Sequence, residues 1–262
     1  MSDVEVVRRF NRTYTPRIGA LDDSFLGSGL PLAAARLLFE VGPDGAIVRD
    51  LRRRLGVDSG YLSRLLRSLE DLRLVTVHDD PADRRRRLCR LTAIGKRTWN
   101  ELDDRSNTTA LDLLAELTPH QRLRLVDALA TAELLVRTST VSFVESDPTS
   151  ADSTWALTAY FDELDQRFIG GFDRAGALGD AVASMVPPTG VFVLAKAADG
   201  IIAGCGGLQT HAAGTAEVKR MWIHRDWRGA GLGSRLLADL AQRCVELGHE
   251  TVVLDTNGVL VE

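Results

Sequence analysis

The chain has 262 residues, of which 45% are hydrophobic and 26% are charged, a composition typical of globular proteins rather than of disordered or fibrous ones. No apolar stretch is long enough to cross a bilayer, and the opening MSDVEVVRRFNRTY lacks the apolar core of a signal peptide, so we expect a cytoplasmic protein with no membrane partner. The three cysteines, Cys89, Cys205 and Cys244, are far apart and the five histidines are scattered, which predicts neither a disulfide framework nor a metal site.

The net charge of -4 is unevenly distributed along the chain. Residues 1–137 hold 23 Lys and Arg against 20 Asp and Glu, whereas residues 138–262 hold 9 against 16. The positive excess is concentrated in residues 47–97, where 14 basic side chains accompany 7 acidic ones. A basic segment in an acidic protein favours a polyanionic partner, and double-stranded DNA is the partner that we expect.

The sequence AIVRDLRRRLGVDSGYLSRLLRSLEDL predicts two helices joined by a short turn, and the helical pattern of the second continues to Leu72. Gly56 suits the C-terminal end of the first helix, and Asp58 or Ser59 can cap the second. One face of the second helix is apolar, with residues at helical spacing: Leu62, Leu65, Leu66, Leu69 and Leu72. Its opposite face is small, polar and basic, as a helix that enters the DNA major groove requires. The candidate DNA-binding residues on this face are Ser59, Ser63, Arg64 and Arg67.

Two short strands follow, LVTVHDD and LCRLT, on either side of a turn-rich loop with four consecutive arginines. In isolation such a charge run usually means solvated surface. Directly after a helix-turn-helix it predicts the hairpin wing of a winged helix, whose tip reaches the minor groove, where arginine is favoured. The candidate DNA-binding residues of this wing are Asp83, Arg84, Arg85, Arg86 and Arg87.

The stretches DSGYLSRLLRSLEDLRLV and DPADRRRRLCRLTAIGK resemble the MarR family of winged-helix regulators. The Asp-Xaa-Arg core of the family's wing matches Asp83 and Arg85, and its closing Leu-Thr-x-x-Gly matches Leu91, Thr92 and Gly95. The resemblance extends from the N-terminus to about residue 137. It implies a DNA-binding transcriptional regulator that forms a homodimer through intertwined N- and C-terminal helices.

The residues themselves predict a long helix after the winged helix. In LTPHQRLRLVDALATAELLVR, Thr118 is placed to cap the helix, Pro119 occupies its first position and Gln121 completes a capping box. The preceding ALDLLAEL is a second apolar helical segment. Two apolar helices outside a small winged helix either pack within their own monomer or need a partner surface, and we expect the second copy of a dimer.

The segment around SDPTSADS is polar and turn-rich. We therefore expect a winged-helix and dimerisation domain over residues 1–140, a linker over 141–153 and a second domain over 154–262. The second domain is predicted to be α+β, with its elements in chain order: helix 155–168, strands 191–197, 201–210 and 216–224, helix 231–247 and strand 251–255. Short turns between consecutive strands indicate antiparallel neighbours. The expected fold class is thus a mostly α winged helix-turn-helix with dimerisation helices, followed by an α+β domain with a mixed sheet.

Within EVKRMWIHRDWRGAGLGSRLL, three glycines lie between a strand and a helix. Glycine lets backbone amides approach an anion, and a helix N-terminus adds free N–H groups, so the pattern predicts a phosphate-binding turn. One alternative is that the glycines serve tight packing. Another is a dinucleotide-binding fold, which the spacing to Asp255 permits but the antiparallel strands before the motif disfavour.

The same stretch resembles the GNAT acetyltransferases. Their Q/R-x-x-G-x-G/A signature matches Arg228, Gly231 and Gly233, and KRMWI is similar to the strand whose backbone binds the pantetheine arm. The resemblance implies N-acetyltransferase activity with acetyl-CoA as the cofactor and an amine as the acceptor. The cofactor-binding residues that it implies are Met221, Ile223, Arg228, Gly229, Gly231, Gly233, Ser234 and Asn257.

For catalysis, the resemblance implies a base that removes a proton from the amine, and Glu217 is the best-placed carboxylate. The alternative, that Glu217 is a surface residue on an edge strand, remains open. The family continues beyond the fifth strand, often with a tyrosine acid, whereas this chain ends at Glu262, so we expect a C-terminally incomplete domain and assign no acid. Two functions follow: a regulator fused to an active acetyltransferase, or a regulator whose second domain senses an acyl-CoA or small-molecule effector without turnover.

Overall fold

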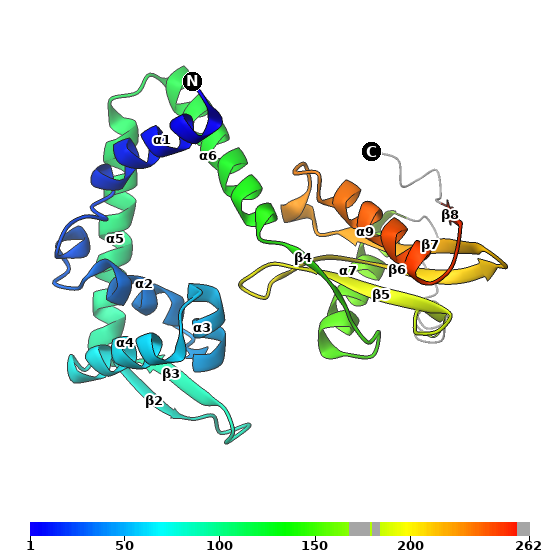
Figure 1. Ribbon diagram of the computed structural model, residues 1–262. Helices are drawn as coiled ribbons and strands as arrows, with labels where there is room; N and C mark the ends of the chain where they lie inside the picture. Colours follow the sequence, from blue (N-terminus) through cyan, green and yellow to red (C-terminus); the bar gives the residue numbers. More distant parts are fainter. Residues whose placement is uncertain (168–178, 180–183, 256–262) are drawn as a thin grey trace. The chain divides into compact units, whose positions relative to one another are not determined.

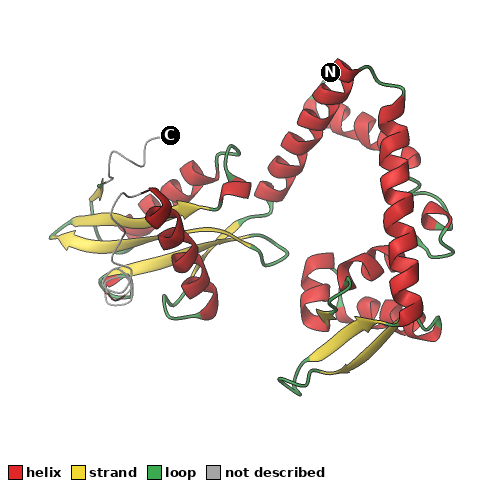
Figure 2. Ribbon diagram, turned by 180° about the vertical axis from the view of Figure 1, so that it is seen from behind, coloured by secondary structure: helices red, strands yellow, loops and turns green. Residues whose placement is uncertain are grey.

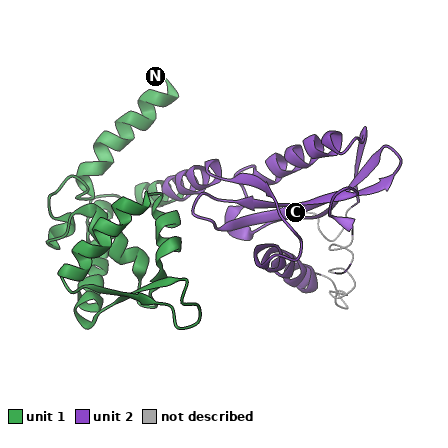
Figure 3. Cartoon of the chain, turned by 60° about the horizontal axis from the view of Figure 1, so that its bottom comes forward, with its two compact units in different colours: residues 1–127 green, residues 128–262 purple. Residues whose placement is uncertain are grey.

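The computed structural model describes residues 1–167, 179 and 184–255, and the chain divides into two compact units, residues 1–127 and 128–262 (Figure 1, Figure 3). The first unit is mostly helical with a small sheet, and the second contains a five-stranded mixed sheet with helices (Figure 2). These features confirm the expected fold class. Among the described residues, no helix is long and apolar enough to span a membrane.

The first unit packs four of its helices around one apolar core. Its elements in chain order are α1 (Asp3–Arg17), η1 (Phe25–Gly27), α2 (Leu32–Val41), β1 (Ala46–Ile47), α3 (Val48–Leu55), α4 (Ser59–Asp71), β2 (Val75–Asp79), β3 (Arg87–Leu91), α5 (Ala93–Ala115) and the first part of α6 (Pro119–Ser139). Fully buried leucines from four helices meet in the core: Leu37, Leu38, Leu51, Leu62, Leu69 and Leu102. The apolar stripe expected on α4 is thereby explained as the face that joins this helix to the rest of the unit.

The predicted helix-turn-helix is present in α3 and α4. Helix α3 ends at Gly56, whose left-handed backbone (φ 64°) suits glycine. Asp58 caps α4 by accepting a hydrogen bond of 2.8 Å from the Tyr61 N–H, and this bond lowers the pKa of the Asp58 carboxyl. The stripe ends earlier than predicted, because Leu72 follows the last turn of α4 and is 53% exposed.

The predicted wing is a β-hairpin. Strands β2 and β3 are antiparallel from the pair Val75↔Leu91 to the pair Asp79↔Arg87, and β1 joins β3 on the other side. The hairpin is held by the residues that follow it: the Thr92 hydroxyl donates to the Arg73 carbonyl at 2.6 Å and accepts from the Gly95 N–H at 3.0 Å. A β-carbon at Gly95 would overlap the Leu74 carbonyl oxygen, so this close approach requires glycine.

The second unit is built on one sheet with strand order β4-β5-β6-β7-β8. Its elements after α6 are β4 (Ser142–Glu145), α7 (Ala151–Arg167), β5 (Gly190–Lys196), β6 (Ile202–Ala212), β7 (Thr215–Ile223), η2 (Arg225–Trp227), α9 (Leu232–Glu246) and β8 (Thr251–Leu254). Consecutive strands are antiparallel up to β7, and β8 is parallel to β7 after the crossover through α9. This topology disfavours the dinucleotide-binding alternative, which needs an all-parallel unit.

Alternating side chains of the strands separate the two faces of the sheet. On one face α7 contributes Leu157, Phe161 and Leu164 to an apolar cluster, and on the other face α9 contributes Leu236 and Leu240. The strands and helices expected from the sequence are all found here. The expected linker is different: β4 pairs with β5 and α7 begins at Ala151, so residues 141–153 include a strand and the start of a helix. The domain boundaries themselves stay a prediction.

Candidate functional site

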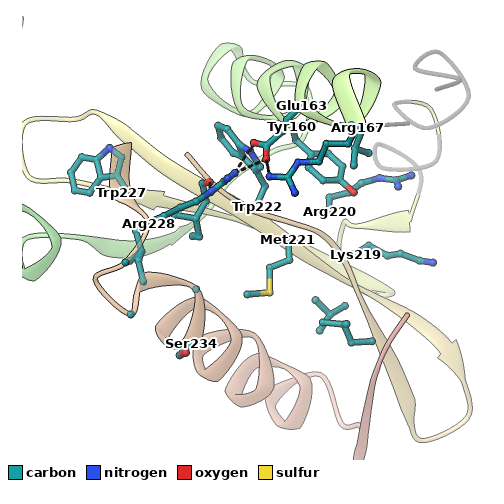
Figure 4. A pocket seen from close by; sticks show the side chains of 18 of the residues that line it. Tyr160, Glu163, Arg167, Lys219, Arg220, Met221, Trp222, Trp227, Arg228 and Ser234 are labelled. Carbon is teal, nitrogen blue, oxygen red and sulfur yellow. Dashed lines mark hydrogen bonds and ion pairs between the residues drawn. The ribbon is translucent and has the colours of Figure 1, made fainter. Parts of the chain in front are cut away.

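A cavity of about 660 Å³ opens in the second unit where β7 and β8 separate (Figure 4). Their pairing ends at Val218↔Leu254, whereas β7 continues to Ile223. The backbone of β7 beyond Val218 therefore borders the cavity on the side of β8. The walls come from α7, β7, the loop before α9 and the end of β8.

The glycine loop forms one end of this cavity. Gly229 and Gly231 have left-handed backbones (φ 84° and 72°), and a β-carbon at either would have no neighbour within 4 Å. These two glycines therefore do not serve tight packing; their backbone conformation is the reason for glycine. Gly231 caps α9 without a side-chain hydrogen bond, so the free N–H groups at this helix end are left for an anion.

Arg228 ties the loop to two other elements. Its Nε donates to the Ile223 carbonyl at 2.9 Å, and its Nη2 donates to both carboxylate oxygens of Glu163 on α7, at 2.7 and 2.6 Å. Glu163 also accepts from Trp222 Nε1 at 2.8 Å and from Arg167 Nη2 at 2.7 Å (Figure 4). Burial acts to raise the pKa of the Glu163 carboxyl, but these donors outweigh it and hold the pKa below its ordinary value.

Glu217 lies in the interior of the sheet. It is 6% exposed and sits on β7, which has β6 on one side and β8 on the other, so the alternative of a surface residue on an edge strand is wrong. Its carboxylate accepts from Lys219 Nζ at 2.5 Å and from Gln209 Nε2 at 3.2 Å. Burial acts to raise the pKa of Glu217, but the bond and charge of Lys219, together with the Gln209 hydrogen bond and the nearby His211, outweigh it and lower this pKa. Lys219 lines the cavity, whereas Glu217 is not among the described residues that do.

In the first unit, the outer face of α4 presents the residues expected to contact DNA. Ser59, Ser63, Arg64 and Arg67 are all exposed. The Ser63 hydroxyl donates to the Ser59 carbonyl at 2.8 Å, and the Arg64 guanidinium lies 5.7 Å from the centre of the Tyr61 ring. The face is therefore polar and positively charged, without apolar side chains from the core.

Asp83 organises the tip of the hairpin. Its carboxylate accepts from the Arg85 N–H at 3.0 Å and pairs with Arg86 Nε at 3.2 Å, while its carbonyl accepts from the Arg86 N–H at 2.8 Å. The four consecutive arginines, Arg84 to Arg87, are exposed. Asp83 thus has a local structural role, and the arginines supply the exposed positive charge.

Several long helices of the first unit carry exposed apolar side chains. On α1 these are Val4, Val7 and Phe10, and on the first part of α6 they are Leu123 and Val126. These side chains are 46–65% exposed, although apolar residues of these types are more often buried. Such surfaces are consistent with the partner surface expected from the sequence.

Two family models match the chain, each to one of these regions. Residues 28–86 match the MarR family, and residues 145–258 match the acetyltransferase (GNAT) family. We call residues 28–86 the MarR-family segment and residues 145–258 the GNAT-family segment, after the models that they match. Helices α3 and α4 and strand β2 lie in the MarR-family segment, and β3 follows directly after it; the cavity lies in the GNAT-family segment.

Individual relatives are similar to parts of the chain. An uncharacterised N-acetyltransferase of Schizosaccharomyces pombe is 32% identical over 76 residues, which are 29% of this chain and 47% of that protein, so the chain spans about half the length of this curated relative. A MarR-family regulator from Rhodococcus sp. RHA1 is 19% identical, with a TM-score of 0.42 over 50% of this chain and 94% of that one. An acyl-CoA N-acyltransferase from Klebsiella pneumoniae, described as putative, is 22% identical, with a TM-score of 0.36 over 46% and 74%.

The structure brings most of the predicted cofactor residues of the GNAT-family segment together. The cavity is lined by Met221, Ile223, Arg228, Gly229, Gly231, Gly233 and Ser234. Asn257 lies outside the described residues. Among the described residues, no cluster of His, Cys, Asp or Glu that could hold a metal ion is found.

Sequence reasoning missed the polar residues that α7 contributes to the cavity. Tyr160, Glu163 and Arg167 line it, and burial raises the pKa of the Tyr160 hydroxyl. Nothing in the segment YFDELDQR distinguishes Glu163 from its acidic neighbours Asp162 and Asp165. Only the position of α7 on the sheet, which places Glu163 opposite Arg228, identifies it.

Proposed function

We propose that the chain is a DNA-binding transcriptional regulator whose GNAT-family domain binds acetyl-CoA and transfers the acetyl group to an amine. The observation that carries the proposal is the cavity between β7 and β8, which ends at a helix N-terminus without a side-chain cap, where two glycines have left-handed backbones and no close neighbours. Backbone N–H groups at such a helix end bind phosphate groups well. The chemistry of the donors therefore fits the pyrophosphate of an acyl-CoA.

The roles of the cavity residues follow from this placement. The N–H groups from Gly229 to Ser234 would hold the pyrophosphate, and the backbone of Met221 and Ile223 would hydrogen-bond the pantetheine arm along the free edge of β7. Arg228 would hold the loop in shape through its hydrogen bonds to the Glu163 carboxylate and the Ile223 carbonyl, in addition to supplying positive charge. Acetyl-CoA, when bound, supplies an activated acyl group as a thioester.

Transfer to an amine requires that the amine lose a proton, and we assign the general base to Glu217. Lys219 keeps its carboxylate ionised, which is the form that accepts a proton. Because Lys219 and not Glu217 borders the cavity, the proton would travel through a water relay. The pairing with Lys219 also supports the second candidate function, in which the domain senses an acyl-CoA without turnover, since a paired carboxylate of lowered pKa is a weak base.

For the MarR-family segment, we propose that α4 enters the major groove and that the wing arginines reach the adjacent minor groove. The exposed, basic faces of α4 and of the hairpin tip support this role. The exposed apolar side chains of α1 and α6 support a homodimer, which would bind two half-sites about one or more helical turns apart.

The enzyme and the sensor are separated by two measurements on the full chain. Isothermal titration with acetyl-CoA measures binding, and mass spectrometry after incubation with acetyl-CoA and a panel of amines measures transfer. Binding with transfer, reduced strongly in Glu217→Gln but not in the surface variant Glu250→Gln, supports the acetyltransferase. Binding without transfer to any amine supports the sensor. No binding of acetyl-CoA, CoA or longer acyl-CoAs would contradict both.

A further inference from the structure

The loop expected to hold the pyrophosphate is buried at both of its ends in an apolar cluster that includes Val141, just after the end of α6. Trp227, just before the loop, is 2% exposed, and Leu232, the first residue of α9, is 1% exposed. Both belong to one apolar cluster with Val141, which follows α6 closely in the chain. The chain that leaves α6 therefore forms part of the floor on which the loop rests.

Arg235 makes a second, polar connection. It lies in the first turn of α9, and its guanidinium donates to the Thr138 carbonyl at 2.7 Å and to the Val141 carbonyl at 2.9 Å. The last carbonyls of a helix have no partner within the helix, and a cation there is favourable. Arg235 thus caps the C-terminal end of α6 while it belongs to the helix turn that carries the free N–H groups.

A third connection is made by a side chain of α6 that contacts the residue just before the loop. Arg137, in the last turn of α6, places its guanidinium 4.2 Å from the centre of the Trp227 ring and pairs with Glu133 at 3.1 Å. Arg137 does not belong to the described lining of the cavity. Its contact route to a ligand in the cavity runs through Trp227 and the loop.

We propose that α6 is the element that senses an acyl-CoA in the cavity. This inference rests on the proposed acyl-CoA binding. The N–H groups that would hold the pyrophosphate, Arg235 and the ring of Trp227 form one connected assembly, so a ligand that fixes the loop also fixes the end of α6. Helix α6 begins at Pro119 in the first unit and ends in the second. By linkage, any state of α6 that the ligand favours must in turn strengthen binding of the ligand by the same factor.

The test is backbone hydrogen exchange of the full chain with and without saturating CoA, read on peptides from residues 119–139 and 228–234. In the parent, CoA should slow exchange in both segments. Arg235→Met should remove the effect in residues 119–139 and weaken CoA binding, measured by titration, by about fivefold or more, the lower end of typical coupling factors. The matched control is Arg243→Met, on the same helix, whose contacts are with Asp239, Phe143 and Glu145 and not with α6.

The Arg137→Met variant keeps the test informative if Arg235→Met misfolds, because it removes a different contact, the one that Arg137 makes with Trp227 from outside the cavity. It should weaken CoA binding in the same direction. Protection that appears in residues 228–234 but not in 119–139, or CoA affinity unchanged in both Arg235→Met and Arg137→Met, would overturn the inference and leave the proposed function standing. Failure of the parent to bind CoA would overturn the proposed function and, with it, the inference.

Discussion

Gly231 adopts a left-handed backbone and leaves the N–H groups at the start of α9 open to a ligand, and its replacement by alanine tests these two roles separately. The left-handed backbone (φ 72°) costs an alanine about 1–2 kcal/mol, partly offset by about 0.4–1 kcal/mol from the reduced freedom of the unfolded chain. No atom lies within 4 Å of the new β-carbon, so no clash adds to this cost. The net loss in the free energy of unfolding should be about 1 kcal/mol.

Gly248, beyond the other end of α9, provides the matched control. Its φ is 83°, and its β-carbon would also have no neighbour within 4 Å, so Gly248→Ala should lose about the same stability. Only Gly231→Ala places a methyl group beside the N–H groups that a phosphate oxygen must approach to about 2.9 Å. We therefore expect acetyl-CoA affinity to fall at least about tenfold, or ~1.4 kcal/mol, in Gly231→Ala and to stay unchanged in Gly248→Ala.

Two assays decide this prediction. Urea unfolding followed by tryptophan fluorescence reports on the second unit, because Trp155, Trp222 and Trp227 lie there and only Trp99 lies in the first. Titration calorimetry gives the affinity for acetyl-CoA. Equal losses of stability in both variants, together with parental acetyl-CoA affinity in Gly231→Ala, would refute the placement of the pyrophosphate at this helix end.

Four further predictions concern the rest of the chain. Arg85→Ala should weaken DNA binding and reduce its dependence on salt, because each neutralised phosphate releases counterions; an unchanged salt slope would make the wing a solvated surface. Arg64→Ala should lose about 1–3 kcal/mol of DNA binding and relax the preference at one base pair, and a uniform loss over all sequences would instead indicate a phosphate contact. Phe10→Asp should shift the sedimentation of the chain from dimer to monomer, and a parent that sediments as a monomer at micromolar concentration while binding DNA tightly would contradict the dimer. The lowered pKa of Glu163 contributes stability at neutral pH that is lost as the pH falls through this pKa. Glu163→Gln should therefore unfold more easily than the parent at neutral pH and lose less stability on acidification; parallel stability-versus-pH profiles of the two proteins would contradict this.

The fold could be predicted from the sequence wherever periodicity and punctuation agree. Gly56 and Asp58 mark the turn between α3 and α4 by their backbone chemistry, and the structure shows the left-handed cap and the side-chain cap that these residues suggest. In the second unit, the continuous apolar run VFVLA located β5, because a strand that is buried on both faces needs apolar side chains on both. The end of α4 was misplaced, since Leu72 continues the helical spacing but lies just beyond the last turn.

What depends on long-range pairing could not be predicted. Strand β4 is short and contains polar residues, and only its ladder with β5 makes it a strand. The contact between Glu163 and Arg228 joins residues 65 positions apart, and no local pattern predicts it. No local pattern predicts the backbone of Arg220 either: its left-handed conformation (φ 54°) coincides with the irregular pairing of β6 and β7 at the cavity. Local signals therefore located the glycine loop, but not the side chains that brace it.

The most direct test of the acyl-CoA site is a crystal structure of the full chain grown with CoA. Pyrophosphate oxygens should lie within hydrogen-bonding distance of backbone N–H groups between Gly229 and Ser234, with the pantetheine arm alongside Met221 and Ile223. CoA bound away from the N-terminus of α9, with this loop and the edge of β7 making no contact with it, would contradict this placement of the ligand.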